Sequence, residues 1–164
     1  MLGASAVRGA QRTGPTTFDL NDGNDSALVA LEDRLHWDPS QFIQTELTVG
    51  KGAGNGGKAI TSVARDTDSA RTARLLVHDG FDHLLPPFGS FRNTSILPIA
   101  VPKSLGRGAV AVHEGPHGGI DQAAAAVWVR GKRVLILVVD APRVTNPDQL
   151  ARNLAQRQDQ LACA

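Results

Sequence analysis

The sequence contains little sulfur and few aromatic rings. Its 164 residues include one cysteine, Cys163, two tryptophans, five phenylalanines and no tyrosine. A lone cysteine cannot form an intramolecular disulfide or a cysteine-based metal site. The low aromatic content argues against a surface on which nucleic-acid bases stack. Valine, leucine, isoleucine and alanine must therefore fill the core.

The sequence also lacks an excess of charge of one sign and a long apolar run. Lys and Arg number 17 against 16 Asp and Glu, so no overall field attracts nucleic acid or an anionic membrane. No stretch reaches the roughly 18 apolar residues of a membrane-spanning helix. Residues 1–20 lack the apolar segment of an intact signal peptide. They are either a natural flexible start or the remainder of a removed anchor or signal.

The apolar content is sufficient for a folded domain. Apolar residues make up 41% of the chain and charged residues 20%, which is typical of a globular protein. The length matches that of one domain. We therefore expect a flexible N-terminal arm over residues 1–17 and a single α+β domain over residues 18–164.

Two hydrophobic periods alternate along the chain. Period two and β-branched content predict strands over 42–49, 58–66, 95–101 and 109–115, and a hairpin over 123–140. Helical spacing predicts a short helix over 26–36 and two longer ones over 67–85 and 145–162. The expected fold class is α+β, with a mostly antiparallel sheet of five to six strands that packs one face against two main helices.

Several residues mark the ends and faces of these elements. Pro98 confines its strand to an edge or a bulge, because proline cannot donate to the hydrogen-bond ladder. Thr67 or Asp68 is expected to cap the second helix. In the last helix, Leu154 and Leu161 are expected to face the core together with Leu150.

Residues 50–57, GKGAGNGG, raise the question of a phosphate-binding loop. With the following Lys58 they match G-x-x-x-x-G-K, and they also match G-x-G-x-x-G. Under this hypothesis the phosphate-binding residues are Gly52, Gly54, Gly57 and Lys58, with Asp140 at the end of RVLILVVD as the Mg²⁺ ligand.

Two features argue against a phosphate loop. Ala59 stands where such loops carry a Ser or Thr hydroxyl for Mg²⁺. The preceding segment, 43–49, alternates apolar and polar residues, whereas the strand before a phosphate loop is normally buried on both faces. Five of the eight residues over 50–57 are glycine, which is also typical of a wide hairpin loop between two strands. A helix that begins at Lys58 would support nucleotide binding, and a strand would oppose it.

His113 and His117 form the motif H-E-x-x-H, which binds zinc when both histidines lie one turn apart on a helix. Here Gly115 and Pro116 stand between them, and both residues disfavour a helix. The two histidines are therefore candidate metal ligands only if a loop brings them together. A small hydrolase stays open as an alternative function, although the chain has no G-x-S-x-G elbow.

Four aromatic residues are candidate ligand contacts. Phe88 and Phe91 flank a Gly-Ser pair in a proline-rich connection, and Trp37 follows the first predicted helix. Trp128 lies in an apolar hairpin arm, where it either belongs to the core or covers it. Each of the four fits a core position or the wall of a ligand cleft.

The order of these elements resembles a known group of domains. The segments that carry the resemblance are ITSVARDTDSARTARLL, SLGRGAVAV, AVWVRGKRVLILVV and LARNLAQRQDQL. Over about residues 43–161 the pattern resembles small extracytoplasmic domains of high-GC Gram-positive bacteria, which occur as cell-envelope lipoproteins and as sensor domains of receptor kinases. The resemblance implies an α+β fold, a location outside the membrane, no catalysis, and a cleft for a ligand or partner. It transfers no functional residue.

The first hypothesis is therefore a non-enzymatic extracytoplasmic binding or sensor domain without a cofactor or catalytic residue. Its cleft is expected between sheet and helices, beside the glycine loop and residues 86–102. Its partner is expected to be a small molecule or an envelope protein rather than nucleic acid. The alternatives are a nucleotide-binding or phosphoryl-transfer protein that uses Lys58 and Asp140, and a small hydrolase; a cytoplasmic location is the alternative to an extracytoplasmic one.

Overall fold

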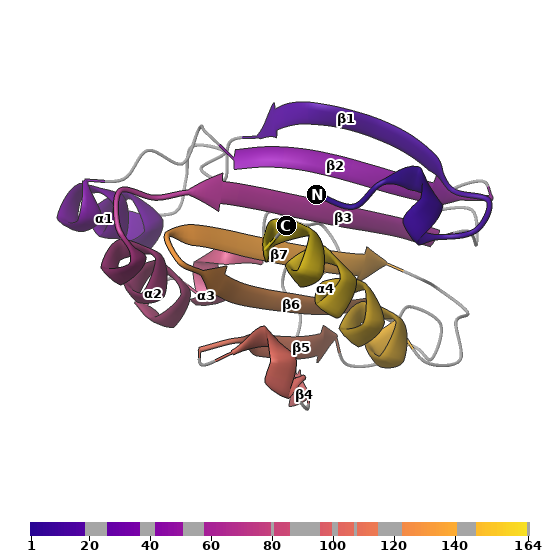
Figure 1. The fold of residues 1–164 in the computed structure, drawn as a ribbon. Coiled ribbons are helices and arrows are strands. Elements are labelled where there is room, and N and C mark those ends of the chain that lie inside the picture. Colours follow the sequence, from indigo (N-terminus) through magenta and orange to yellow (C-terminus); the bar gives the residue numbers. More distant parts are fainter. Residues whose placement is uncertain are drawn as a thin grey trace.

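The fold is built around one antiparallel sheet with helices on both faces (Figure 1). The computed structural model describes residues 1–18, 26–36, 42–50, 58–79, 81–85, 96–99, 102–106, 108–114, 123–140 and 147–163. Among these residues, no helix is long and apolar enough to cross a membrane.

The described strands form a seven-stranded sheet in the order β1-β2-β3-β7-β6-β5-β4, with every neighbouring pair antiparallel. Their bounds are β1 Gln11–Phe18, β2 Phe42–Val49, β3 Lys58–Asp66, β4 Ile96–Ile99, β5 Val110–Glu114, β6 Ala123–Arg130 and β7 Arg133–Asp140. The predicted α+β class and antiparallel sheet are confirmed. Strand β4, which contains Pro98, lies at a sheet edge as expected.

The helices begin and end close to the predicted positions. Their bounds are α1 Ser26–Leu35, α2 Ala70–Asp79, α3 Phe81–Leu84 and α4 Pro147–Cys163, and the short 3₁₀ segments are η1 Ala4–Ala6 and η5 Lys103–Leu105. The cap of α2 is one or two residues later than predicted. The Ser69 hydroxyl accepts the backbone N–H of Thr72 at 3.1 Å, as an N-cap does.

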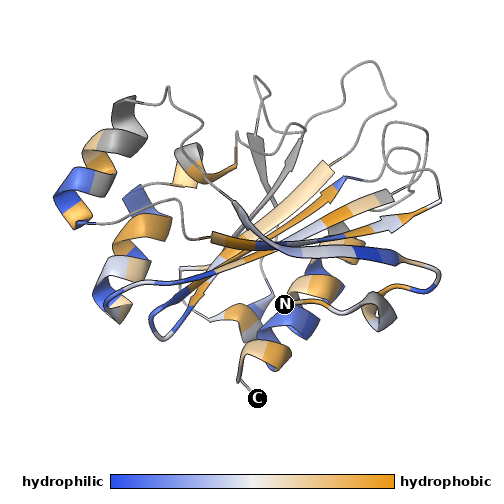
Figure 2. Ribbon diagram, turned by 90° about the horizontal axis from the view of Figure 1, so that it is seen from above, coloured by the Kyte–Doolittle hydropathy of each residue, from blue (hydrophilic) through white to orange (hydrophobic). Residues whose placement is uncertain are grey.

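The core has two halves because β6 and β7 are apolar on both faces. Successive side chains of a strand point to opposite faces, and Val134, Ile136 and Val138 pack with α2 while Leu135 and Leu137 pack with α4. Figure 2 shows the central strands as mainly hydrophobic and the helices as two-sided. The prediction that both main helices cover one face is wrong, because an apolar strand pair needs cover on each face.

The predicted flexible arm over residues 1–17 is also wrong. Residues 11–18 form β1, which pairs with β2 and adds a seventh strand to the expected five or six. Leu2 is fully buried, and Ala6 and Val7 pack against the same half of the core as α4. Figure 1 shows this N-terminal segment and α4 on the same side of the sheet. The backbone N–H of Leu2 donates to the Ser62 hydroxyl at 3.4 Å, so the segment packs on β3.

A polar network that is buried at Trp128 and Asp159 joins α4 to the sheet. Asp159 accepts a hydrogen bond from the Trp128 indole N–H at 2.9 Å. Arg130 donates to both carboxylate oxygens of Asp159, from Nε at 2.5 Å and from Nη2 at 2.6 Å. Arg130 Nη2 also donates to the Ser104 carbonyl, and Gln156 Nε2 lies 3.0 Å from the Ser104 hydroxyl. This network connects β6, α4 and η5.

Gly14 occupies a position in β1 that requires glycine. Its φ is +97°, and an added Cβ would lie 2.8 Å from the Gln44 carbonyl oxygen. Gly14→Ala is expected to lower the free energy of unfolding by about 1–3 kcal/mol, measured by urea denaturation. Gly9→Ala is the matched control, since Gly9 has φ +76° but open space around it. An equal loss in both variants would show that the contact with Gln44 is unimportant.

Candidate functional site

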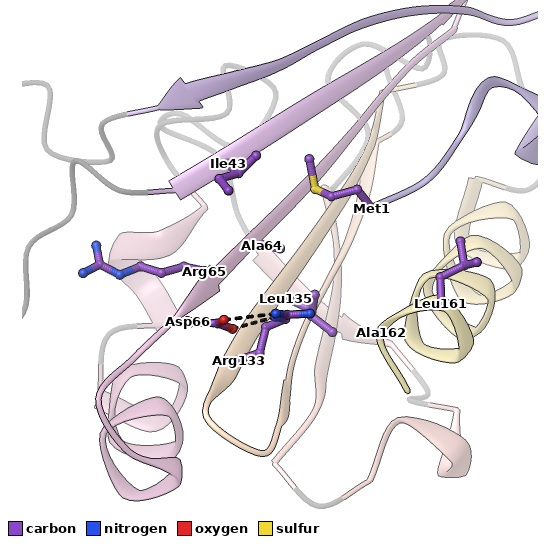
Figure 3. Close-up of a pocket in the computed structure, with 9 residues that line it drawn as sticks. All are labelled: Met1, Ile43, Ala64, Arg65, Asp66, Arg133, Leu135, Leu161 and Ala162. Atoms are coloured by element: carbon purple, nitrogen blue, oxygen red, sulfur yellow. Dashed lines mark hydrogen bonds and ion pairs between the residues drawn. The ribbon is translucent and has the colours of Figure 1, made fainter. Parts of the chain in front are cut away.

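A cavity of about 380 Å³ lies on the α4 side of the sheet, within the roughly 300–1,000 Å³ of small-molecule sites. Ile43 of β2, Ala64 of β3 and Leu135 of β7 are register partners on three neighbouring strands and form one wall. Leu161 and Ala162 of α4 also line the cavity, as does Met1 (Figure 3). The site is therefore built from the middle of the sheet and both ends of the described chain.

The apolar lining is unusually open to solvent. Ile43 is 46% exposed and Leu161 51% exposed, and within the described ranges these two are the large hydrophobic side chains classed as exposed. Both line this cavity. The prediction that Leu161 belongs to the core is wrong. Leu161 lines the cavity instead, with half of its surface exposed.

An ion pair occupies the polar end of the cavity. Asp66 and Arg133 are register partners across β3 and β7. Arg133 Nε donates to one carboxylate oxygen at 2.6 Å, and Nη2 donates to the other at 3.0 Å. The Asp66 side chain is 46% exposed and the Arg133 side chain 42% exposed, so bound molecules can reach them. Arg133 Nη1 takes no part in this ion pair.

The pKa shifts of the pair reflect this geometry. Hydrogen bonding to Arg133 lowers the pKa of Asp66; burial opposes this shift, and the charges of Arg133 and Lys132 reinforce it. The hydrogen bond to Asp66 raises the pKa of Arg133. At neutral pH both groups are therefore charged, and Asp66 holds the guanidinium at the edge of the cavity.

Several cationic side chains act on the ionisable groups that line the cavity. Asp66 is the one acid among the nine lining residues. Burial lowers the pKa of the Met1 amino group, and the nearby charges of Arg133 and Arg12 lower it further. Lys132 acts electrostatically on Asp66. Arg133, Arg12 and Lys132 thus act electrostatically on Met1 or Asp66, both of which line the cavity.

Arg65 belongs to the lining but directs its charge elsewhere. Its guanidinium lies over the Phe42 ring, with its carbon 5.7 Å from the ring centroid. Because Phe42 packs in the half of the core that faces α2, this cation–π contact lies on the opposite face of the sheet. In Figure 3 the Arg65 side chain extends away from Met1 and Leu161.

Of the four predicted aromatic contacts, Trp128 lies within the described residues, and it is not part of the lining of this cavity. Trp37, Phe88 and Phe91 lie outside the described residues, so their roles stay predictions. Trp128 is fully buried between β6 and α4 and donates its indole N–H to Asp159. This placement agrees with the core interpretation of Trp128 and leaves its ring no exposed surface for a ligand.

The structure opposes a phosphate loop. Gly52, Gly54 and Gly57 lie outside the described residues. Lys58 begins strand β3 opposite Val49, where a phosphate loop needs a helix. Asp140 pairs with Ala59 at the same end of the sheet. Lys58 and Asp140 are therefore close together in the sheet, but the strands around them are antiparallel, unlike the parallel strands of a phosphate-loop fold. Both residues lie at the end of the sheet opposite the cavity.

The zinc motif is not helical in the part that the structure describes. His113 and Glu114 belong to strand β5, and His117 lies outside the described residues. In the described part of the chain, no group of three or more His, Cys, Asp or Glu residues is placed to hold a metal ion. The helical H-E-x-x-H arrangement is thus contradicted at its first two residues.

Four side chains define the cavity, and none of them was predicted as a site residue: Ile43, Asp66, Arg133 and Leu161. None belongs to a motif. The available signal was the position of Asp66 and Arg133 at strand ends, next to apolar residues of the same face. The two lie 67 residues apart, so using this signal required knowing that β3 pairs with β7.

The fold belongs to a class of α+β domains that includes an extracellular protein domain. A solved structure with this arrangement is the extracellular domain of PknH from Mycobacterium tuberculosis. It superposes with a TM-score of 0.53 and 10% sequence identity, over 96% of this chain and 88% of that chain. No protein-family model and no curated protein matches the sequence. At this identity the similarity establishes the fold.

Proposed function

We propose that this protein is a non-enzymatic binding or sensor domain that works outside the cytoplasmic membrane. The observation that carries the proposal is the shared fold with the extracellular domain of PknH over 96% of the chain. The cavity beside α4 gives such a domain a place for a small molecule. Its lining combines open apolar side chains with an exposed ion pair, which suits recognition rather than bond cleavage.

The location outside the membrane is tested in intact cells of the natural host. A membrane-impermeant amine-reactive biotin reagent is added before lysis, and the protein is then captured and detected by antibody. An extracytoplasmic domain is expected to be labelled in intact cells, while a cytoplasmic control protein is labelled only after lysis. Labelling of both proteins only after lysis would overturn the proposal.

Binding is tested by thermal shift of the purified protein. The panel contains ATP, GTP and NAD with Mg²⁺, Zn²⁺, lipids and cell-wall fragments. A ligand that binds only the folded state raises the melting temperature with its concentration. We expect stabilisation by an envelope component. Stabilisation by nucleotide with Mg²⁺, abolished by Lys58→Ala, would instead support the nucleotide-binding alternative.

A further inference from the structure

We propose that the cavity beside α4 binds an aliphatic carboxylate, with its chain between Ile43 and Leu161 and its carboxylate at Arg133. This inference names the ligand class for the proposed function and rests on it. Three properties of the cavity lead to this class: its exposed apolar sides, its volume and the sign of the charge at one end.

The apolar part of the ligand follows from the two exposed side chains. Burial of apolar surface is favourable, so an occupant that covers both Ile43 and Leu161 is stabilised most. Ala64, Leu135 and Ala162 continue the apolar lining between them. An unbranched hydrocarbon segment fits this lining, since it needs no hydrogen-bond partners along its length.

The size of the ligand follows from the cavity volume. At about 30 Å³ for each water-sized group, a volume of about 380 Å³ holds about a dozen non-hydrogen atoms. Decanoate is a saturated carboxylate of this size and serves as the probe. Longer chains would extend into solvent through the open side of the cavity.

The negative charge of the ligand follows from Arg133. Guanidinium groups bind carboxylates through charge-assisted hydrogen bonds, and Nη1 of Arg133 is not used by Asp66. Arg12 and Lys132 add positive charge nearby. Asp66 is then an internal competitor, since it holds Arg133 in place but also neutralises it.

Because Asp66 competes with the ligand for Arg133, substitutions of the two residues are expected to change Kd in opposite directions. Decanoate is titrated into the purified protein by calorimetry, below its self-association concentration. Arg133→Gln is expected to raise Kd about tenfold or more, the loss of one charge-assisted hydrogen bond. Asp66→Asn is expected to lower Kd, because the competing carboxylate is gone. If both variants weaken binding equally, the pair has only a structural role and the proposal fails.

Matched controls separate charge from position. Arg74→Gln removes an exposed cation of α2, away from the cavity, and is expected to leave Kd within about twofold, since distant surface charges are screened. Leu161→Glu places a carboxylate in the lining and is expected to abolish binding, while Gln160→Glu, one residue away and exposed, is expected to retain it. Equal effects of the two glutamate variants would overturn the proposal.

Two further probes test the two parts of the ligand. Decanol carries the chain without the charge, and acetate carries the charge without the chain. Both are expected to bind at least about tenfold more weakly than decanoate. Decanol binding as tightly as decanoate would overturn the assignment of Arg133. If decanoate does not bind but another envelope component stabilises the protein, the carboxylate inference is wrong and the proposed function stands. If the labelling experiment places the protein in the cytoplasm, the proposed function is wrong.

Discussion

Trp128→Ala is expected to lower the free energy of unfolding by about 3–5 kcal/mol, the range for truncation of a buried large aromatic side chain. Trp128 is the largest of the fully buried side chains among the described residues. Its ring packs between the sheet and α4, with Leu135, Leu154 and Ala155 in the same half of the core. The truncation leaves a cavity and removes the hydrogen bond to Asp159.

The measurement is urea denaturation followed by far-ultraviolet circular dichroism. Trp128→Phe is the matched control, because it keeps an aromatic ring but loses the indole N–H. We expect it to destabilise the protein by about 1.5–3 kcal/mol, the contribution of a hydrogen bond to a charged group, because Arg130 still donates to both oxygens of Asp159. A loss below about 1 kcal/mol for Trp128→Ala would contradict the described packing of α4.

Asp159→Asn is expected to lower the free energy of unfolding by about 3 kcal/mol, the lower end of the range for breaking a buried ion pair. The Asp159 carboxylate is 8% exposed and the Arg130 side chain 32% exposed, so solvent already screens part of the interaction. Asparagine keeps one acceptor oxygen but turns an amide group toward Arg130. A change within about 0.5 kcal/mol would show that the network is not important for stability.

The same variant should change the response to acid. Burial raises the pKa of Asp159, but hydrogen bonds from Arg130 and Trp128 outweigh it, so the pKa lies below its usual value. The unfolded state then binds more protons than the folded state, and stability is lost as pH falls below about 5. Asp159→Asn is expected to show a shallower acid loss. The half-exposed Asp66 contributes a smaller part of the stability that is lost in acid, and the Asp159→Asn variant retains this part.

Local signals predicted most of the elements. The β2–β3 and β6–β7 hairpins follow from strand patterns separated by turn residues, and α4 follows from Pro147 and its leucine spacing. Strand β1 was missed because QRTGPTTF has no alternation of apolar and polar residues. It contains Gly14 and Pro15 and is held by pairing with β2 rather than by burial of its own side chains.

The arrangement of the elements was harder to predict than their existence. The apolar character of both arms of the hairpin over 123–140 was visible, and it required helices on both faces. The spacing of Leu154 and Leu161 placed them on one helical face, yet spacing cannot show where the underlying core ends. Leu161 therefore lies beside a cavity instead of in a packed interior.

The candidate site was not predicted because the recognisable motifs lie at the other end of the sheet. The glycine pattern precedes β3 at Lys58, whereas the cavity lies near its last residues, Ala64 to Asp66. The predicted ligand contacts were aromatic, but the described cavity is lined by aliphatic side chains and an ion pair. Such a site has no short signature, because its parts come from β2, β3, β7 and α4.

The NMR signal of the Arg133 side chain tests most directly whether this cavity is the binding site. The side-chain ¹⁵N–¹H signal of Arg133 Nε is followed by NMR during titration with decanoate, together with the methyl signals of Ile43 and Leu161. We predict that all three signals shift along one saturable binding curve. Unchanged signals at these residues, with shifts confined to the glycine loop over 50–57 or to another surface, would contradict the proposed site.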